Sequence, residues 1–192
     1  MERNAIWLGL LVGAWGCNGD DETDTAGDDG TPGDTDTDEE EEENEVPPQG
    51  YAQLDPWLDA GEYLDWYCEA ASRASTGVSP HGIVRVCSNE FASEHATGEF
   101  PVDSASVKEL YDVDMTTLVG YAVSIKVSTG TSGGTWYWYE QVPPGTTITG
   151  VTIDANGVVA DGLGDDGSQA ETICASCHST ASNDYVFVQV GE

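Results

Sequence analysis

Basic residues are scarce in this chain: 5 Lys or Arg stand against 36 Asp or Glu, and the formal net charge at pH 7 is −31. Nucleic acids and anionic membrane surfaces bind through Lys and Arg, so this composition argues against both as partners. Long apolar runs are missing too. The run at residues 5–15 is only about half of the roughly 20 residues that a membrane-spanning helix needs.

This short apolar run predicts an export signal. Arg3 supplies a positive charge before it, and Cys17 follows the small residue Gly16. A small residue before a single Cys resembles the lipobox of bacterial lipoproteins, from which Trp15 is a departure. We expect residues 1–16 to be a lipoprotein signal peptide and Cys17 to be lipidated. The alternative is an ordinary export signal with an incidental Cys. Either signal predicts a location in the periplasm or at the cell surface, with lipid as the sole membrane anchor.

Residues 17–50 are predicted to be a disordered acidic tether. Between Asp20 and Glu45 there are fifteen Asp or Glu and no Lys or Arg. So few apolar side chains cannot offset the entropy of ordering, and the like charges extend the segment. Calcium binding by the Asp repeats is the alternative, but the Gly and Glu of an EF-hand loop do not fall at the required spacing.

Residues 51–192 are predicted to form one folded domain, because apolar residues become frequent near Tyr51. Asp55-Pro56 is expected to begin the first helix, since Pro is tolerated in a first turn. The alternation of apolar residues predicts an α+β fold with a mostly antiparallel sheet and a few packed helices. We expect helices within 54–75, at 89–98 and at 169–179, strands at 83–87, 106–113, 118–129, 135–142 and 184–190, and turns at 143–144 and 156–157.

Two cysteines of the folded region, Cys68 on an expected helix and Cys87 on an expected strand, are candidates for a disulfide. The bond would close a loop of about twenty residues and contribute roughly 3 kcal/mol of stability. An exported protein encounters an oxidising compartment, which favours the disulfide over the alternative of two buried thiols.

Cys174, Cys177 and His178 form the C-x-x-C-H pattern of covalent c-type haem attachment. Two thiols spaced in this way reach the two vinyl groups at one porphyrin edge, and the adjacent His supplies an axial ligand to the iron. The alternatives are a zinc half-site, for which no second Cys pair exists, and a redox pair, for which the usual βαβ context is missing. We therefore predict one haem c per chain, with His178 as the metal ligand.

A second strong axial ligand is not evident in the sequence. Fourteen residues follow His178, and none of them is Met or His. Met115, the one Met beyond the signal, lies far upstream. An open position on the iron suits small-molecule binding or redox catalysis better than simple electron relay.

Several stretches of the folded region resemble the cytochrome P-460 family of hydroxylamine-oxidising haem proteins. They span roughly residues 60–190 and include "HGIVRVCSN", "TGEFPVDSASVKELY", "GYAVSIKV", "TWYWYE", "CASCH" and "NDYVF". The resemblance implies a mostly antiparallel sheet with helices, often in a homodimer, and a lysine bonded to the porphyrin rim. Lys108 in "VKEL" matches that lysine. The alternative for Lys108 is a solvated side chain or a partner of a haem propionate.

One departure from the family bears on activity. Hydroxylamine-oxidising members carry a distal carboxylate on the strand that matches the one beginning at Gly120, and Ala122 stands at the matching position. That carboxylate would be the general base. Related beta-type cytochromes c-prime lack the crosslink and bind nitric oxide or carbon monoxide. The sequence thus predicts redox chemistry on a small nitrogenous molecule, with an electron-acceptor cytochrome as partner; the alternatives are a non-catalytic haem protein that binds nitric oxide or relays electrons, and a surface lipoprotein without haem.

Other residues support weaker hypotheses. Arg85 could pair with a haem propionate or lie exposed on its strand. His81 could be a second ligand, but a structural polar role is the preferred interpretation. Trp136 and Trp138 could wall the haem pocket or fill an ordinary sheet core.

Overall fold

The computed structural model describes residues 46–76 and 79–191. The predicted signal peptide, the lipid site Cys17 and the acidic tether up to residue 45 lie outside the described residues. No helix in the described ranges is long and apolar enough to cross a membrane.

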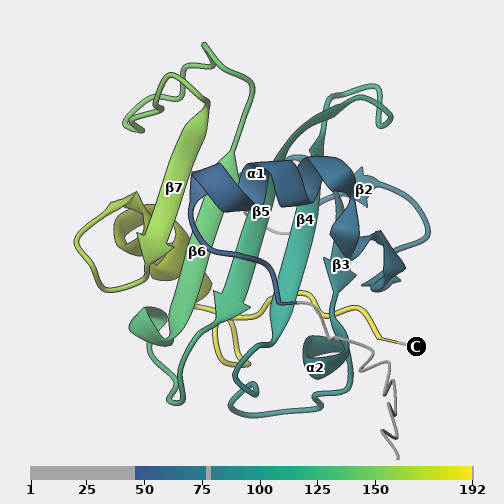
Figure 1. The fold of residues 1–192 in the computed structure, drawn as a ribbon, viewed down its shortest axis with the longest axis vertical. Helices are drawn as coiled ribbons and strands as arrows, with labels where there is room; N and C mark the ends of the chain where they lie inside the picture. Colours follow the sequence, from purple (N-terminus) through teal and green to yellow (C-terminus); the bar gives the residue numbers. More distant parts are fainter. Residues whose placement is uncertain (1–45, 77–78, 192) are drawn as a thin grey trace, which may run out of the picture. The chain divides into compact units, whose positions relative to one another are not determined.

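A seven-stranded antiparallel sheet organises the described part of the chain (Figure 1). The strands follow the order β1-β3-β4-β5-β6-β7, and β2 pairs with β3 beside that path. Together with a few short helices, this sheet confirms the α+β class. The strands are β1 Tyr67–Cys68, β2 Arg73–Ala74, β3 Ile83–Ser88, β4 Ala105–Tyr111, β5 Leu118–Lys126, β6 Trp136–Gln141 and β7 Val158–Leu163.

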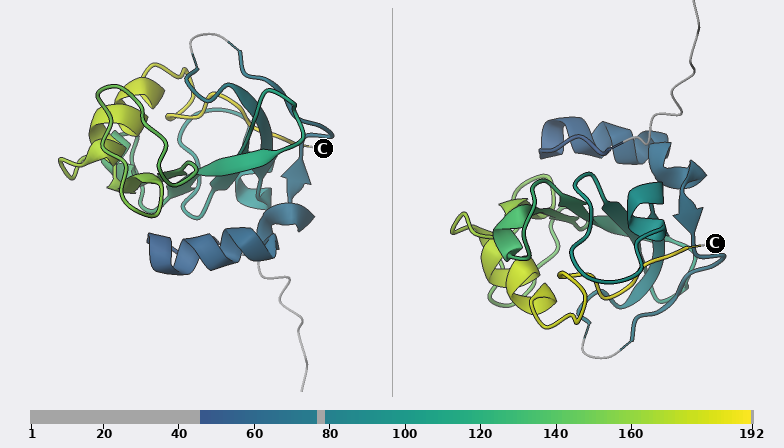
Figure 2. Two further views of the ribbon diagram at one scale, coloured as in Figure 1. Left: turned by 90° about the horizontal axis from the view of Figure 1, so that it is seen from above. Right: turned by 90° about the horizontal axis from the view of Figure 1, so that it is seen from below.

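The helices lie on opposite faces of this sheet. The α1 helix covers one face, and the last helical segment, with the carboxyl-terminal residues, lies on the other (Figure 2). The helical elements are α1 Tyr51–Ala60, α2 Glu90–Ser93 and α3 Ser176–His178, the 3-10 turns η1 Glu62–Asp65 and η2 Gly133–Thr135, and the π-helical segment η3 Ala170–Ala175.

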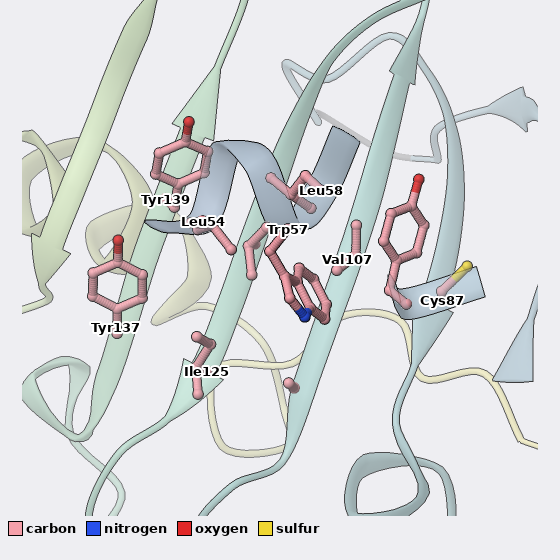
Figure 3. Close-up of a cluster of buried hydrophobic side chains, with 11 residues drawn as sticks. Leu54, Trp57, Leu58, Cys87, Val107, Ile125, Tyr137 and Tyr139 are labelled. Carbon is pink, nitrogen blue, oxygen red and sulfur yellow. The ribbon is translucent and has the colours of Figure 1, made fainter. Parts of the chain in front are cut away.

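The main core lies between α1 and the sheet (Figure 3). Leu54, Trp57 and Leu58 extend from α1 onto the strands and are buried. They meet the inward-facing residues of β3 to β6, namely Cys87, Val107, Val123, Ile125, Tyr137 and Tyr139. Because side chains alternate along a strand, the neighbours of these residues face the opposite side of the sheet.

The start of α1 differs from the prediction. The helix begins at Tyr51, and Pro56 lies inside it. Its first turn is held from the sheet, because the Gly50 amide donates to the Tyr137 hydroxyl at 2.8 Å and the Tyr51 amide donates to the Asp161 carboxylate at 2.9 Å. These long-range bonds satisfy amides that a helix leaves free at its start, and the local sequence does not reveal them.

A disulfide joins Cys68 and Cys87, as the cysteine partition suggested. Cys68 lies on β1, where a helix was expected, and is paired directly opposite Cys87 of β3. The bond therefore ties the first edge of the sheet to its interior.

A second, smaller core forms on the face opposite α1. Ala170 and Ala175 of η3 pack against Trp136 and Trp138 of β6. Gly164 permits this close approach: a Cβ added there would lie 2.7 Å from the Cβ of Ala175, closer than carbon atoms tolerate. The predicted helix over 169–179 is confirmed as η3 followed directly by α3.

The predicted last strand at 184–190 is wrong. Asp184 and Tyr185 have positive φ angles of 38° and 67°, which interrupt extended backbone. Only an isolated bridge, between Asn183 and Val186, forms in this region of the structure. Conversely, the sequence does not predict β7. Turn signals surround this strand, and its second half contains Asp161 and Gly162.

Leu54→Ala should lower the free energy of unfolding by about 2–5 kcal/mol, because it removes a fully buried side chain between α1 and the sheet. Urea unfolding followed by circular dichroism measures the change. Asp59→Ala, an exposed change on the same helix, should stay within about 0.5 kcal/mol of the wild type. A similar cost for both variants would mean that α1 is not the main source of the core's stability.

Candidate functional site

The face of the sheet opposite α1 contains a hollow that is partly open to solvent. A second hollow adjoins it, and the two share His81, Lys108, Cys177, His178 and Phe187 in their lining. Much of the first hollow is apolar, with Val86, Ala122, Trp138, Ile173 and Val186 among its lining residues.

The segment formed by η3 and α3 brings the C-x-x-C-H motif to this hollow. Cys174, Cys177 and His178 all line it, and both cysteines are free thiols. Residues three apart lie on one side of a helical turn, so both thiols face the same space. π-helical turns such as η3 are frequent at functional sites.

The ring of His178 is held from two sides. Nδ1 lies 2.7 Å from the Tyr185 carbonyl oxygen. A carbonyl can only accept, so Nδ1 carries the proton and Nε2 keeps its lone pair. Trp138 and Phe187 contact the ring, with centroid distances of 4.6 and 5.1 Å. Burial lowers the pKa of His178 to about 4, so the ring is neutral at pH 7 and can bind a metal through Nε2.

A row of side chains crosses the sheet beside the motif. Lys108 of β4 is paired with Ala122 of β5, and Ala122 is paired with Glu140 of β6. All three line the hollow. The sequence interpretation placed Ala122 at the carboxylate position and found no base there, but Glu140 supplies a carboxylate one strand away. The small side chain of Ala122 leaves the space between Lys108 and Glu140 open.

The two lysines of the chain differ sharply. Lys126 is fully buried and forms an ion pair with Asp184 at 2.7 Å. For Lys108 we find no hydrogen bond or ion pair of Nζ within the described ranges. Burial lowers the pKa of Lys108, which increases the neutral, nucleophilic fraction of its amine, and the Glu140 carboxylate opposes this shift.

His81 also lines the hollow, near Glu140. Its Nδ1 is 3.9 Å from Oε1 of Glu140, too far for a hydrogen bond, and has no other partner among the described residues. Burial, reinforced by the charge of Lys108, lowers the pKa of His81 to about 3. Burial raises the pKa of Glu140, although Lys108 opposes the change. The structure thus brings a neutral imidazole and a proton-accepting carboxylate together.

Arg85 lies on the other face of the sheet, so the hypothesis that it binds a haem propionate is wrong for this arrangement. Its Nη1 contacts both carboxylate oxygens of Glu109 at 3.2 Å. Arg73 lines the second hollow instead and is paired there with Glu69 at 2.7 Å.

The aromatic residues of β6 divide between the faces. Trp138 lies beside His178 and lines the hollow, whereas Tyr137 and Tyr139 belong to the α1 core. Trp136 lies in the smaller core and contacts Phe100. The prediction of a pocket wall is therefore confirmed for Trp138 but not for Trp136.

The electrostatics of the thiols argue against a redox pair. Burial, with the Glu140 carboxylate nearby, raises the pKa of Cys174 to about 12. Reactive C-x-x-C pairs stabilise a thiolate and have lowered thiol pKa values. A zinc site is also unsupported, since within residues 46–76 and 79–191 no three or more His, Cys, Asp or Glu side chains are arranged so that they could hold a metal ion.

The residues present fit a covalent haem. Two free thiols, a histidine with Nε2 available and an apolar wall meet at one hollow. Comparison of the chain with protein-family models, curated proteins and solved structures gives no match. The resemblance to the cytochrome P-460 family therefore remains a hypothesis that depends on these residues.

The stability of the protein should fall as the pH falls below about 6.5, because unfolded His81 binds a proton near that pH whereas the folded residue does so only near pH 3. This residue alone should contribute a slope of about 1.4 kcal/mol per pH unit between pH 6 and 5. His81→Gln should remove that part of the slope in urea unfolding. Between about pH 7 and 8 the two proteins should have parallel stability curves; equal slopes at low pH would contradict the burial of a neutral His81.

Proposed function

We propose that this protein is an exported, membrane-tethered c-type haem protein of the cytochrome P-460 type, which carries out redox chemistry on a small nitrogenous molecule such as hydroxylamine. The observation that carries the proposal is the meeting of Cys174, Cys177 and His178 with Lys108 and Glu140 at one hollow. Each of these residues has a separate role in the proposal.

Cys174 and Cys177 would hold the haem, and His178 would bind its iron through Nε2. Each thiol forms a bond from sulfur to one vinyl carbon while its hydrogen goes to the other, so no electrons are gained or lost. The Tyr185 carbonyl fixes the orientation and tautomer of His178. When bound, the haem supplies an iron that binds the small molecule and passes its electrons to an acceptor such as a second cytochrome.

Glu140 would accept the protons that leave the substrate as it is oxidised. Its raised pKa brings the carboxyl closer to the working pH, where a general base is most effective. The neutral imidazole of His81, whose Nδ1 lies 3.9 Å from the carboxylate, is placed to share that proton after a small movement.

Lys108 would bond to the porphyrin rim. Its amine has no competing partner within the described part of the chain, unlike the amine of Lys126. The new bond replaces one N–H and one C–H, so it releases two electrons and two protons and requires an added two-electron oxidant such as a peroxide.

The apolar lining favours a second function, binding of an uncharged gas such as nitric oxide, without catalysis. The side chains of Val86 and Ala122 contain no hydrogen-bond donor, and the indole N–H of Trp138 donates to the Gly133 carbonyl oxygen. Such a protein would buffer the gas or relay electrons at the cell surface.

Intact mass tests the covalent attachments. The full chain, produced with a c-type haem maturation system, should gain the mass of one haem that survives denaturation, whereas Cys174→Ser/Cys177→Ser should gain none. After peroxide treatment the wild type should lose two hydrogens and its ferrous Soret band should shift to the red. Lys108→Met should keep the haem without either change. A colourless wild type would refute the proposed function.

Activity tests the role of Glu140. Glu140→Gln should lower kcat for hydroxylamine oxidation by about 10²–10⁴-fold, the usual contribution of a general base. Glu94→Gln, a matched change at an exposed carboxylate, should leave turnover unchanged. Nitric oxide binding should persist in all three proteins. If the wild type binds nitric oxide but does not turn over hydroxylamine, the non-catalytic function is the correct one.

A further inference from the structure

Asp184 lies at the centre of a fully buried polar network. Its Oδ2 accepts from Lys126 Nζ at 2.7 Å and from the Phe100 amide at 2.9 Å. Its Oδ1 accepts from Trp136 Nε1 at 3.3 Å. The side chains of Lys126 and Asp184 are both 0% exposed. Three separate parts of the chain thus converge on this one carboxylate.

Lys126 is equally well satisfied. Its ammonium donates to Thr135 Oγ1 at 3.0 Å and to the Gly130 carbonyl, in addition to Asp184. It also lies 5.1 Å from the ring centroid of Trp136. A buried ion pair contributes little net stability compared with an apolar pair of the same volume, so a role in specifying local geometry is the better explanation for this one.

The backbone at Asp184 and Tyr185 supports such a role. Both residues adopt left-handed conformations, with φ angles of 38° and 67°. Each costs about 1–3 kcal/mol in a residue other than Gly and persists only where the surroundings enforce it. The bonds to the Asp184 side chain provide that enforcement, and the next carbonyl, of Tyr185, accepts the Nδ1 proton of His178 at 2.7 Å.

We propose that the buried Lys126–Asp184 pair is a positioning device for His178. Lys126, at the end of β5, fixes Asp184. Asp184 in turn holds the strained turn whose Tyr185 carbonyl sets the ring orientation and tautomer of His178. The link to iron chemistry depends on the proposed function, whereas the effect on the His178 ring does not.

The test uses the full chain with Asp184→Asn/Lys126→Met, which removes both charges with little change in volume. The matched control is Glu109→Gln/Arg85→Met, which neutralises a partly buried ion pair on the opposite face of the sheet. Two signals are read. One is the ring ¹⁵N spectrum of His178 in protein made without haem maturation, assigned with His178→Gln. The other is the reduction potential of the matured protein.

The wild type should show the Nδ1–H tautomer of His178. The test variant should show a mixture of tautomers, while the control resembles the wild type. Loss of the hydrogen bond makes the imidazole a weaker donor, so the potential should rise. At a fixed applied potential the ratio of ferrous to ferric protein should increase by about three- to tenfold, the worth of one hydrogen bond.

If the test variant does not fold, Trp136→Phe provides a milder change, because it removes the bond to Oδ1 and part of the packing of the smaller core but keeps both charges of the ion pair. It should move both signals in the same direction by a smaller amount. An unchanged His178 tautomer and potential in the folded variants would overturn the proposal, as would an equal change in the control. A wild type without haem would refute the proposed function, yet the ¹⁵N spectra would still decide whether the pair positions His178.

Discussion

Side chains alternate between the two faces of a pleated strand, and here that alternation separates the stabilising core from the candidate site. On β4, Val107 and Glu109 face α1 while Lys108, between them, faces the hollow. The same alternation on β6 sends Tyr139 to the core and Glu140 to the hollow. A slip of one residue in any of these strands would exchange the two sets, so the core that α1 covers also fixes the register of the site.

The second requirement is that a carboxyl-terminal segment outside the sheet be held against the sheet face. The structure achieves this with side chains instead of a backbone ladder. Asn183 accepts from the Gly98 amide at 2.7 Å, Asp184 binds Lys126, and the Val190 amide lies 3.2 Å from the Ser88 hydroxyl. These bonds attach the segment to the sheet face, and residues 185–188 of the segment then form the second wall of the hollow.

Much of the fold could be predicted from the sequence where local pattern and long-range packing agree. The alternation around Val86, Val107 and Val123 predicts β3 to β5 because each strand has one buried apolar face. The segment 184–190 has the same composition as a strand, yet Asp184 is drawn into a buried ion pair whose partner is 58 residues away in sequence. The composition of a short segment contains no information about so distant a partner, so the prediction of a strand at 184–190 is wrong.

The candidate site divides in the same way. The C-x-x-C-H motif is contiguous, so its three residues are visible without any structure. Glu140 is not, because its closeness to Lys108 depends on the registers of two strand pairs. One local signal was available: Glu140 has the same parity on β6 as Trp138, so a strand that turns Trp138 toward a haem pocket must turn Glu140 there as well.

The charge balance of the hollow follows from this arrangement. In a chain with 36 acidic and 5 basic residues, Lys126 is fully buried and Lys108 is partly buried in the lining of the hollow. Lys126 is neutralised by Asp184, and it is therefore available only for structure. Lys108 has no such partner within the described residues, and Ala122 separates it from Glu140. Burial lowers the pKa of the Lys108 amine and raises the pKa of the Glu140 carboxyl group. Both shifts increase the neutral fraction of the side chain concerned. The two lysines of the sheet therefore differ in their surroundings: Lys126 is paired with Asp184, whereas Lys108 lines the hollow beside the motif without such a partner among the described residues.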